Sequence, residues 1–369
     1  MGGTGALQRN RKITMNSESS RYYDALQGEV IREIPENILK PVSDPSFSFL
    51  IGPAFFDPQI NGFAGVDFQK ATLEKTELEH AITELSRNGC SHILITLITA
   101  EVKFLESQLQ RISGFIRESV ILRNSVLGFH LEGPFISNQP GTVGTHPAQF
   151  TRDPDWYLLE RWQKAARGMI RMMTVAPERD GAQDFIRKAT QQGIWISLGH
   201  TQAEFSQLRE AQTSGARMIT HLGNACPEEL PRHDNIIHRC LALPDLLATL
   251  IPDGIHLPPV LFAQLVELLG PTRLLFTSDA MSAAGAVPGR YTLGNVETTV
   301  ERDGAVRNPN GKGLTGSSLT PIQGFYTAIR LGDIGVRTAW RAWTRLRDLM
   351  FPGVVPPRLM LPFPDVRRP

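Results

Sequence analysis

The chain has 369 residues, of which 41% are hydrophobic and 20% are charged, and its formal net charge is +1. This is an ordinary globular balance, with enough apolar material for one large core and a small additional domain. A charge so close to zero gives no general attraction to nucleic acid or to an anionic membrane, so any recognition of phosphate must be local.

The cysteines and the N-terminal segment both indicate a cytoplasmic protein. Cys90, Cys226 and Cys240 contain no CxxC pair, and their odd number and scattered positions suit a reducing compartment. The first residues carry positive charge without a following apolar stretch, and no apolar run reaches the roughly 18 residues that a membrane span requires. We therefore expect no membrane partner and no nucleic-acid partner.

The chain divides into four predicted segments. Residues 1–16 are polar and Gly-rich and are expected to be disordered, and residues 17–50 are expected to form the N-terminal part of a small β domain. From residue 51 to residue 325, apolar runs of strand length alternate with stretches of helical spacing. The predicted strands are Ile51–Phe56, Ile93–Ile98, Val126–Leu131, Met169–Val175, Ile194–Leu198, Met218–Leu222, Leu246–Ile251 and Leu274–Thr277. The predicted helices are Glu74–Arg87, Val102–Arg117, Pro154–Arg167, Ala182–Gln192, Ala203–Thr213 and Pro258–Leu269.

Eight buried strands that alternate with helices predict a (β/α)8 TIM barrel. A doubly wound open sheet is the alternative. That fold would favour a Gly-rich phosphate loop after the first strand, and GxGxxG is absent there.

The last predicted segment, residues 326–369, differs in composition from the barrel. It contains eight arginines and six prolines but no lysine and no glutamate. A helix over Asp333–Met350 remains compatible with the pattern, whereas the prolines after Phe351 are expected to prevent any regular element. The composition indicates an atypical tail and raises the hypothesis of translation in a shifted reading frame.

Polar residues follow the predicted strands at the end where barrels of this type carry their active sites. They are Asp57, Gln59 and Asn61 after the first strand, His130 and Glu132 after the third, His200 after the fifth, His221 after the sixth and Asp279 after the eighth. A carboxylate and two imidazoles from three strands can hold Zn²⁺ or a similar ion and leave one position open for water, whose pKa the metal lowers toward about 7. Asp279 then has the position of a general base that passes a proton to a leaving amine.

Each of these residues also has a purely structural interpretation. A single histidine after a strand is more often hydrogen-bonded structure than a ligand, Glu132 could cap a loop before Gly-Pro, and Asp279 could be an N-cap. All of these interpretations would have to hold at once, at matching strand ends. That coincidence favours the metal site.

Several loop residues are candidates for contact with a substrate. His146 lies in a Gly-rich segment that can fold over the pocket, where it would polarise a carbonyl group. Asn224 and Ala225 follow His221 and can hold an anion, and His256 follows the seventh strand, near which barrels often bind phosphate. Arg232 is a further candidate cation, although a solvated surface arginine is an equally good interpretation.

Seven motifs in register resemble those of the N-acetylglucosamine-6-phosphate deacetylase family of amidohydrolases. They are FFDPQINGFAGVDF, GFHLEGPFIS with GTHP downstream, LGHT, THLGNA, PDGIH, TSDAM and GLTGSSLT, between about residue 48 and about residue 323. The resemblance implies an amidohydrolase barrel with a small β-sandwich built from both chain ends. It also implies a homodimer in which a cationic residue of the partner subunit helps to hold phosphate.

The resemblance assigns roles to individual residues. Metal would be bound by Glu132, His200 and His221, Asp279 would be the acid/base, and His146 would contact the acetyl carbonyl. The sugar phosphate would meet Asn224, Ala225 and His256. Beyond what the resemblance assigns, we expect Arg232, Gln59, Asn61 and Leu314 to contact the substrate as well. The implied reaction hydrolyses N-acetylglucosamine 6-phosphate to glucosamine 6-phosphate and acetate.

Three features depart from the family pattern. Amides at Gln59 and Asn61 replace the HxH pair of many amidohydrolases, and amides are poor ligands for Zn²⁺, so we predict one divalent ion, with Zn favoured and Fe as the alternative. PEELPRHDNIIHR replaces the usual arginine-bearing loop, so that Arg232 or His233 would have to substitute. The closing helix and strands of the family are not recognisable after Phe325.

Two other functions are compatible with the sequence. The barrel could act on another amide, as a cyclic amidase, a deaminase or a deacetylase of an unphosphorylated sugar. Alternatively, the chain could be an unstable non-catalytic remnant, because the altered tail would weaken the small domain.

Overall fold

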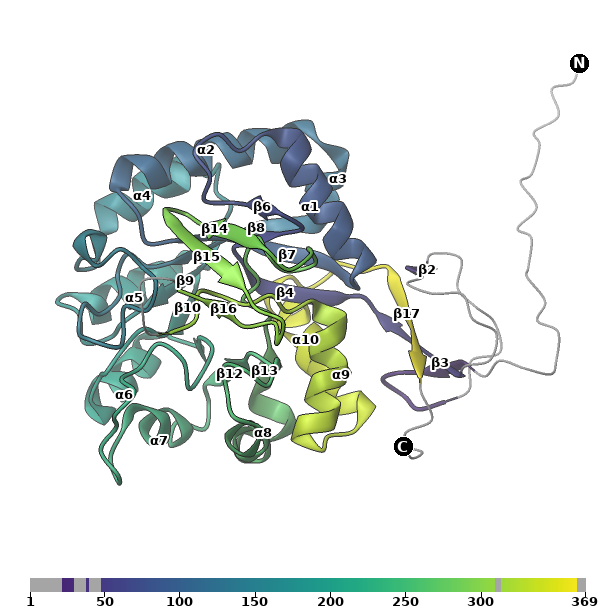
Figure 1. Ribbon diagram of the computed structural model, residues 1–369. Helices are drawn as coiled ribbons and strands as arrows, with labels where there is room; N and C mark the ends of the chain where they lie inside the picture. Colours follow the sequence, from purple (N-terminus) through teal and green to yellow (C-terminus); the bar gives the residue numbers. More distant parts are fainter. Residues whose placement is uncertain (1–21, 30–37, 40–47, 309–312, 364–369) are drawn as a thin grey trace, which may run out of the picture.

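The computed structural model describes residues 22–29, 38–39, 48–308 and 313–363. The expectation of disorder for residues 1–16 lies outside these residues. Figure 1 shows a ring of helices around a central barrel, with a small sheet that contains β3 (Ser48–Pro53) and β17 (Arg358–Phe363) beside it.

The central sheet is a parallel barrel, as predicted. Within the described residues it has eight strands, each hydrogen-bonded to the next barrel strand along the chain. A bridge between Ile60, at the end of the first strand, and Ala280, in the segment after the last strand, brings these two strands together. The strands are β4 (Phe55–Ile60), β7 (Cys90–Ile98), β8 (Val126–Glu132), β9 (Ile170–Val175), β10 (Trp195–Leu198), β11 (Met218–Ile219), β12 (Leu247–Leu250) and β13 (Leu274–Phe276). Their side chains are almost all buried, because helices cover the outside and the barrel interior is filled.

Helices follow the strands and bury one face against them. In α1, Leu78, Ala81, Ile82 and Leu85 form the buried stripe, and Glu74 and Glu77 form a capping box at the start. The helices are α1 (Lys75–Arg87), α2 (Val102–Glu118), α3 (Val120–Ser125), α4 (Trp156–Ala165), α5 (Ala182–Gln191), α6 (Phe205–Ser214), α7 (Ile236–Leu241), α8 (Pro259–Arg273), α9 (Pro321–Gly332) and α10 (Val336–Met350), with a 3-10 turn η1 (Ala148–Phe150). The six predicted helices are present, α10 lies within the possible helix Asp333–Met350, and α3, α7, α9 and η1 are additional.

The first predicted strand is wrong in its boundaries. The run Ile51–Phe56 is divided between β3 (Ser48–Pro53), which belongs to the small sheet, and β4, which begins the barrel at Phe55. Both pieces are buried, so an apolar run alone does not mark where the chain passes from one sheet to the other. The domain boundary expected at residue 51 therefore falls inside β3.

The C-terminal segment is packed against the barrel. Trp340 and Trp343 of α10 are buried and lie against Phe55, and the indole N–H of Trp340 donates to the carbonyl of Pro53. The buried guanidinium of Arg347 donates to the carbonyl of Ala54 at 2.9 Å. The boundary expected at residue 325 falls within α9, and the reading-frame hypothesis stays a prediction.

The C-terminal half of α10 covers the end of the barrel at which the strands begin, which we call the floor. Leu346 packs there with five buried apolar side chains from the barrel strands. These are Phe56, Leu94, Met172, Met218 and Leu275, and they are joined at the edge by Met350 and Phe351. We call this set the floor cluster.

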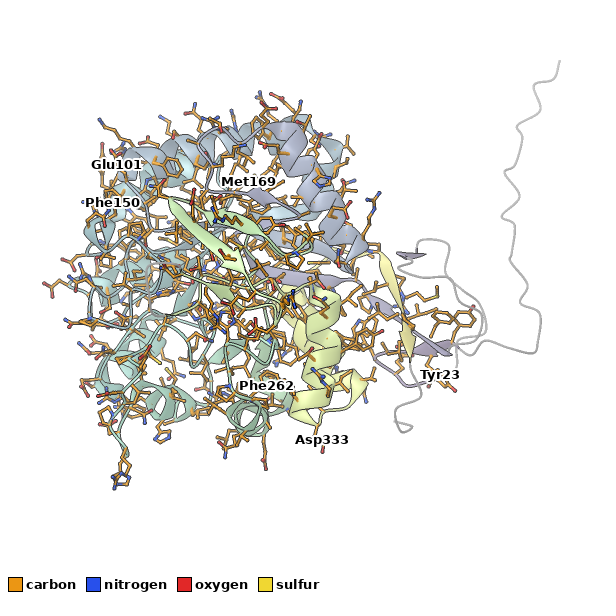
Figure 2. All side chains as sticks on the ribbon, viewed as in Figure 1. Tyr23, Glu101, Phe150, Met169, Phe262 and Asp333 are labelled. Atoms are coloured by element: carbon orange, nitrogen blue, oxygen red, sulfur yellow. The ribbon has the colours of Figure 1, made fainter. Side chains whose placement is uncertain are left out.

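The small sheet uses both ends of the chain. Among the described residues its strand order is β1 (Tyr22–Asp24), β3, β17 (Arg358–Phe363) and β2 (Ile38–Leu39). The prediction that no regular element follows Phe351 is wrong, because β17 runs antiparallel to β3 over its whole length. Pro362 is tolerated there since β2 pairs only with Arg358 and Leu359, which leaves the proline on an open edge within the described part of the sheet. Figure 2 shows Tyr23 on this sheet, apart from Phe262 of α8 and Asp333 after α9.

An insertion between β13 and α9 forms a three-stranded antiparallel sheet over the barrel. It consists of β14 (Arg290–Leu293), β15 (Val296–Val300) and β16 (Val306–Arg307), and Figure 1 shows β14 and β15 in front of the barrel strands. The buried carboxylate of Asp67, which ends β6 (Val66–Asp67) opposite β5 (Gly62–Phe63), holds it in place. Asp67 accepts hydrogen bonds from Thr292 at 3.0 Å and from the N–H of Gly294 at 2.8 Å.

Candidate active site

Three of the predicted residues meet at the carboxyl end of the barrel. Glu132 ends β8, and His200 and His221 each follow their strand by two residues. Their ligand atoms all lie within 4.8 Å of one another, and all three side chains are buried. Oε1 of Glu132 is 3.1 Å from Nε2 of His200 and 2.9 Å from Nε2 of His221. Within the described residues, this is the group of acidic, histidine and cysteine side chains that can hold a metal ion.

The hydrogen bonds of His200 fit a metal ligand. Its Nδ1 lies 2.8 Å from the carbonyl oxygen of Thr142, which can only accept, so this nitrogen carries the proton. In the neutral ring, Nε2 then presents a lone pair to the carboxylate of Glu132. Two acceptors that face each other in a buried site need a cation between them, and a histidine fixed by a backbone carbonyl is the usual arrangement at metal centres.

The backbone at the site is held in an uncommon conformation. His200, His221 and Asp279 have φ values of 52°, 31° and 50°, in the left-handed region that non-glycine residues rarely adopt. Such strain concentrates at functional sites, where the surrounding structure imposes it. Here it turns all three side chains inward immediately after their strands.

The environment of Glu132 keeps its carboxylate ionised. Burial would raise the pKa of Glu132, but contacts with His146, His200 and His221 outweigh it and hold the pKa well below the usual value. A carboxylate that is always charged is the form required of a metal ligand.

Asp279 is joined to Glu132 through an amide. Nε2 of Gln59 donates to Glu132 at 2.8 Å and to Asp279 at 2.9 Å, and Nδ2 of Asn61 donates to Asp279 at 2.8 Å. Burial and the nearby negative charge of Glu132 raise the pKa of Asp279 from 3.8 to about 8. This carboxyl can therefore exchange a proton near neutral pH.

Asp57 fixes the first and last strands beneath the site. Its carboxylate accepts from the hydroxyl of Thr277 at 2.6 Å and from both the N–H and the hydroxyl of Ser278. Burial raises the pKa of Asp57 to about 6 despite these bonds. Since Asp57 is fully enclosed by protein partners, it positions the strand that carries Asp279.

His146 reaches the same point from the loop after β8. Its ring centroid is 4.4 Å from that of His200, and its Nε2 is 3.6 Å from Oε2 of Glu132. Burial, together with the neighbouring His200, lowers the pKa of His146 to about 4, so the ring is neutral. A neutral imidazole can offer one N–H to a carbonyl oxygen.

The remaining predicted residues are less closely tied to this cluster. Asn224 is half-buried and donates to the carbonyl of His221 at 3.1 Å, and Ala225 has a φ of 49°. Nδ1 of His256 is 2.6 Å from the carboxylate of Asp253. Arg232 is exposed and forms no ion pair with another described residue. Leu314 is half-buried and pairs with Arg307.

Sequence reasoning missed two residues that hold the histidines. Thr142 accepts from His200, and Thr99 contacts Nδ1 of His146 through both its N–H and its hydroxyl. Thr99 directly follows β7, so the polar-residue signal at strand ends, applied to the second strand, could have found it. His130, which also lies at a strand end but has no assigned role, bonds to Pro58 and Thr174 inside the barrel and is structural.

Comparison with known proteins identifies the family. The chain is 34% identical to N-acetylglucosamine-6-phosphate deacetylase of Bacillus subtilis (strain 168) over 71% of this chain and 65% of that protein. It is 32% identical to the deacetylase of the same name from Lysinibacillus sphaericus, over 75% of this chain and 70% of that protein. The chain belongs to the N-acetylglucosamine-6-phosphate deacetylase family. No sequence-family model matches it.

A solved deacetylase structure shares the fold of this family member. The structure is of a mutant from Mycobacterium smegmatis in complex with N-acetyl-D-glucosamine-6-phosphate. The two chains are 26% identical with a TM-score of 0.76, and the match covers 88% of this chain and 87% of the other. Among the described residues of this deacetylase-family chain, no helix has the length and apolar character to cross a membrane.

Proposed function

We propose that the protein is an N-acetylglucosamine-6-phosphate deacetylase that releases acetate and glucosamine 6-phosphate. The observation that carries this proposal is the convergence of His146, Glu132 and Asp279 on one point, with His200 and His221 beside them. A carbonyl-polarising N–H, a metal-binding group and a proton acceptor are the three functions that amide hydrolysis requires.

One divalent ion, with Zn²⁺ favoured, would be held by Glu132, His200 and His221. Bound there, the ion lowers the pKa of a coordinated water and supplies a nucleophile at neutral pH. A single ion is supported because the amides of Gln59 and Asn61 already donate to carboxylates and offer no imidazole for a second one.

Asp279 transfers the proton, and His146 polarises the acetyl carbonyl. Asp279 takes the proton of the attacking water on its carboxylate and delivers it to the departing amine nitrogen, so that the carboxylate is regenerated. His146 donates its N–H to the acetyl oxygen as negative charge develops there. The amides of Gln59 and Asn61 keep the Asp279 carboxylate oriented during both transfers.

The phosphate of the substrate is assigned to Asn224, the N–H of Ala225 and His256. His256 is oriented by Asp253, whose carboxylate also accepts the N–H of His256 at 2.9 Å. Arg232, exposed and without an ion pair among the described residues, is available to complete the anion site across a homodimer interface. Three free cysteines support a cytoplasmic location.

The proposal is tested by measuring acetate release from N-acetylglucosamine 6-phosphate and from unphosphorylated N-acetylglucosamine at equal concentrations. We expect turnover of the phosphorylated sugar and at least tenfold lower kcat/KM for the other. Equal kcat/KM values for the two sugars would contradict the assignment of a phosphate site. If folded, zinc-loaded protein released no acetate from either sugar, the chain would instead be an amidohydrolase that acts on another substrate.

A further inference from the structure

The two ring nitrogens of His146 have partners of opposite kind. On one side the backbone N–H of Thr99, which can only donate, is 3.3 Å from Nδ1. On the other side Oε2 of Glu132, which in its ionised form can only accept, is 3.6 Å from Nε2. The contact with Thr99 requires the proton of the neutral ring to be on Nε2, which is the nitrogen that faces the site, and the nearby carboxylate favours the same position.

The side chain of Thr99 makes the closer contact with this ring. Its hydroxyl oxygen is 2.8 Å from Nδ1 of His146, and with Nδ1 unprotonated the hydroxyl must be the donor. Thr99 is 1% exposed, so water cannot replace the hydroxyl without rearrangement. A Cβ on residue 133 would overlap with this hydroxyl, and the residue there is Gly133, with a φ of 84°.

We propose that Thr99 is a positioning residue that fixes the tautomer and the orientation of His146, so that the Nε2–H points at the scissile carbonyl. The inference rests on the proposed deacetylase function for its catalytic consequence. His200 provides the contrast, because a carbonyl acceptor at its Nδ1 leaves the lone pair on the nitrogen that faces the site. Neighbouring imidazoles thus acquire opposite roles, donor and ligand, from the groups behind them.

The test uses Thr99→Val, which removes the hydroxyl while keeping a similar shape, and Thr99→Ser, which retains it. We expect kcat of Thr99→Val to fall about ten- to hundredfold with KM changed less than about threefold, because part of an oxyanion donor's effect is lost. Thr99→Ser should keep at least about a third of the wild-type kcat. Thr344→Val is the matched control for loss of a buried hydroxyl, since Thr344 bonds only within α10.

A double-mutant cycle separates positioning from general structural damage. In a His146→Gln background, Thr99→Val should lower kcat no further, because its effect passes through the histidine. An equal fall in both backgrounds, or full activity of Thr99→Val, would overturn the proposal. If Thr99→Val lacks a cooperative melt, Thr99→Ala is measured in its place.

A second readout does not depend on activity. In metal-free protein labelled with ¹⁵N-histidine, the His146 signals, assigned by their loss in His146→Gln, should show an unprotonated Nδ1 in the wild type and a mixture of tautomers in Thr99→Val. A protonated Nδ1 in the wild type would contradict the proposal even if deacetylation is confirmed. An unprotonated Nδ1 in a wild-type protein that releases no acetate would support the role of Thr99 and contradict the proposed deacetylase function.

Discussion

The two ends of the barrel are built from the same strands but bury opposite kinds of side chain. At the floor, Phe56 of β4 and Met172 of β9 join Leu346 in an apolar cluster. At the carboxyl end, Gln59 of β4 and Glu132 of β8 lie in a buried polar network with Asp279. Along β4, the change from the apolar cluster at Phe56 to the polar network at Gln59 takes only three residues.

This difference separates stability from function along the length of the strands. The floor removes apolar surface from water, which stabilises the fold. The site end instead buries carboxylates, raises the pKa of Asp279 to about 8 and holds three residues in left-handed backbone. These arrangements cost stability, and an active site tolerates them because the rest of the fold offsets them.

The largest expected effect is at the site end. Asp279→Asn removes the proton carrier but keeps an oxygen that can accept from Asn61, so kcat should fall about 10²- to 10⁴-fold. Bound metal should remain at the wild-type level, and the melting temperature should stay close to that of the wild type, because asparagine keeps the shape of a side chain whose raised pKa of about 8 already leaves it largely uncharged at neutral pH. Near-normal turnover would show that Asp279 is not the acid/base.

The matching change at the floor should affect stability alone. Leu346→Ala leaves a cavity in the floor cluster and should lower the free energy of unfolding by about 2–5 kcal/mol, measured in urea, with kcat unchanged. Leu349→Ala, on the same helix and 44% exposed, should change it by less than about 0.5 kcal/mol. Equal losses in the two variants would mean that the floor is not packed as described.

A buried carboxylate at the site end should give stability a dependence on pH. Burial raises the pKa of Asp67 from 3.8 to about 6, so the folded protein binds this proton more tightly than the unfolded chain. Ionisation of Asp67 therefore destabilises the wild type as pH rises from about 4 to about 6. Relative to Asp67→Asn, which cannot titrate, the wild type should lose about 3 kcal/mol between about pH 3 and about pH 7 in urea unfolding. A constant difference would show that the Asp67 pKa is not raised.

The smallest expected effect concerns the phosphate. His256→Ala and Arg232→Ala should each raise KM for the phosphorylated sugar by about tenfold, or roughly 1.4 kcal/mol, with little change in kcat. Neither should change the weak hydrolysis of the unphosphorylated sugar. An unchanged KM in both variants would remove the phosphate from the substrate assignment.

The sequence predicted the barrel because its strands are uniformly apolar runs separated by amphipathic stretches. It predicted the buried group of Glu132, His200 and His221, which can hold a metal ion, because these three residues interrupt this pattern at equivalent strand ends. Periodicity failed at Ile51–Phe56, because this single apolar run contains the end of β3 in the small sheet and the start of β4 in the barrel. It also failed at Pro362, because a proline is tolerated in a strand only where no neighbouring strand needs its N–H.

The features that the sequence did not predict depend on contacts between residues that are distant in the chain. The role of Thr99 depends on an imidazole 47 residues away, and that of Asp57 on hydroxyls more than 200 residues away. Burial of Trp340 depends on Phe55, and burial of Leu346 depends on the floor cluster, whose other members belong to strands far from α10 in the sequence. Composition marked the tail as unusual, but it held no information on where those side chains pack.

The most direct test of the account is metal stoichiometry measured together with activity. The protein is stripped with a chelator, its fold is checked by circular dichroism, and Zn²⁺ is added in steps while acetate release and bound metal are recorded. We predict a folded, inactive metal-free protein whose activity returns in proportion to bound zinc and saturates at one ion per chain, and a Glu132→Gln variant that binds zinc far more weakly. Full activity without metal, or saturation only at two ions per chain, would contradict the site described here.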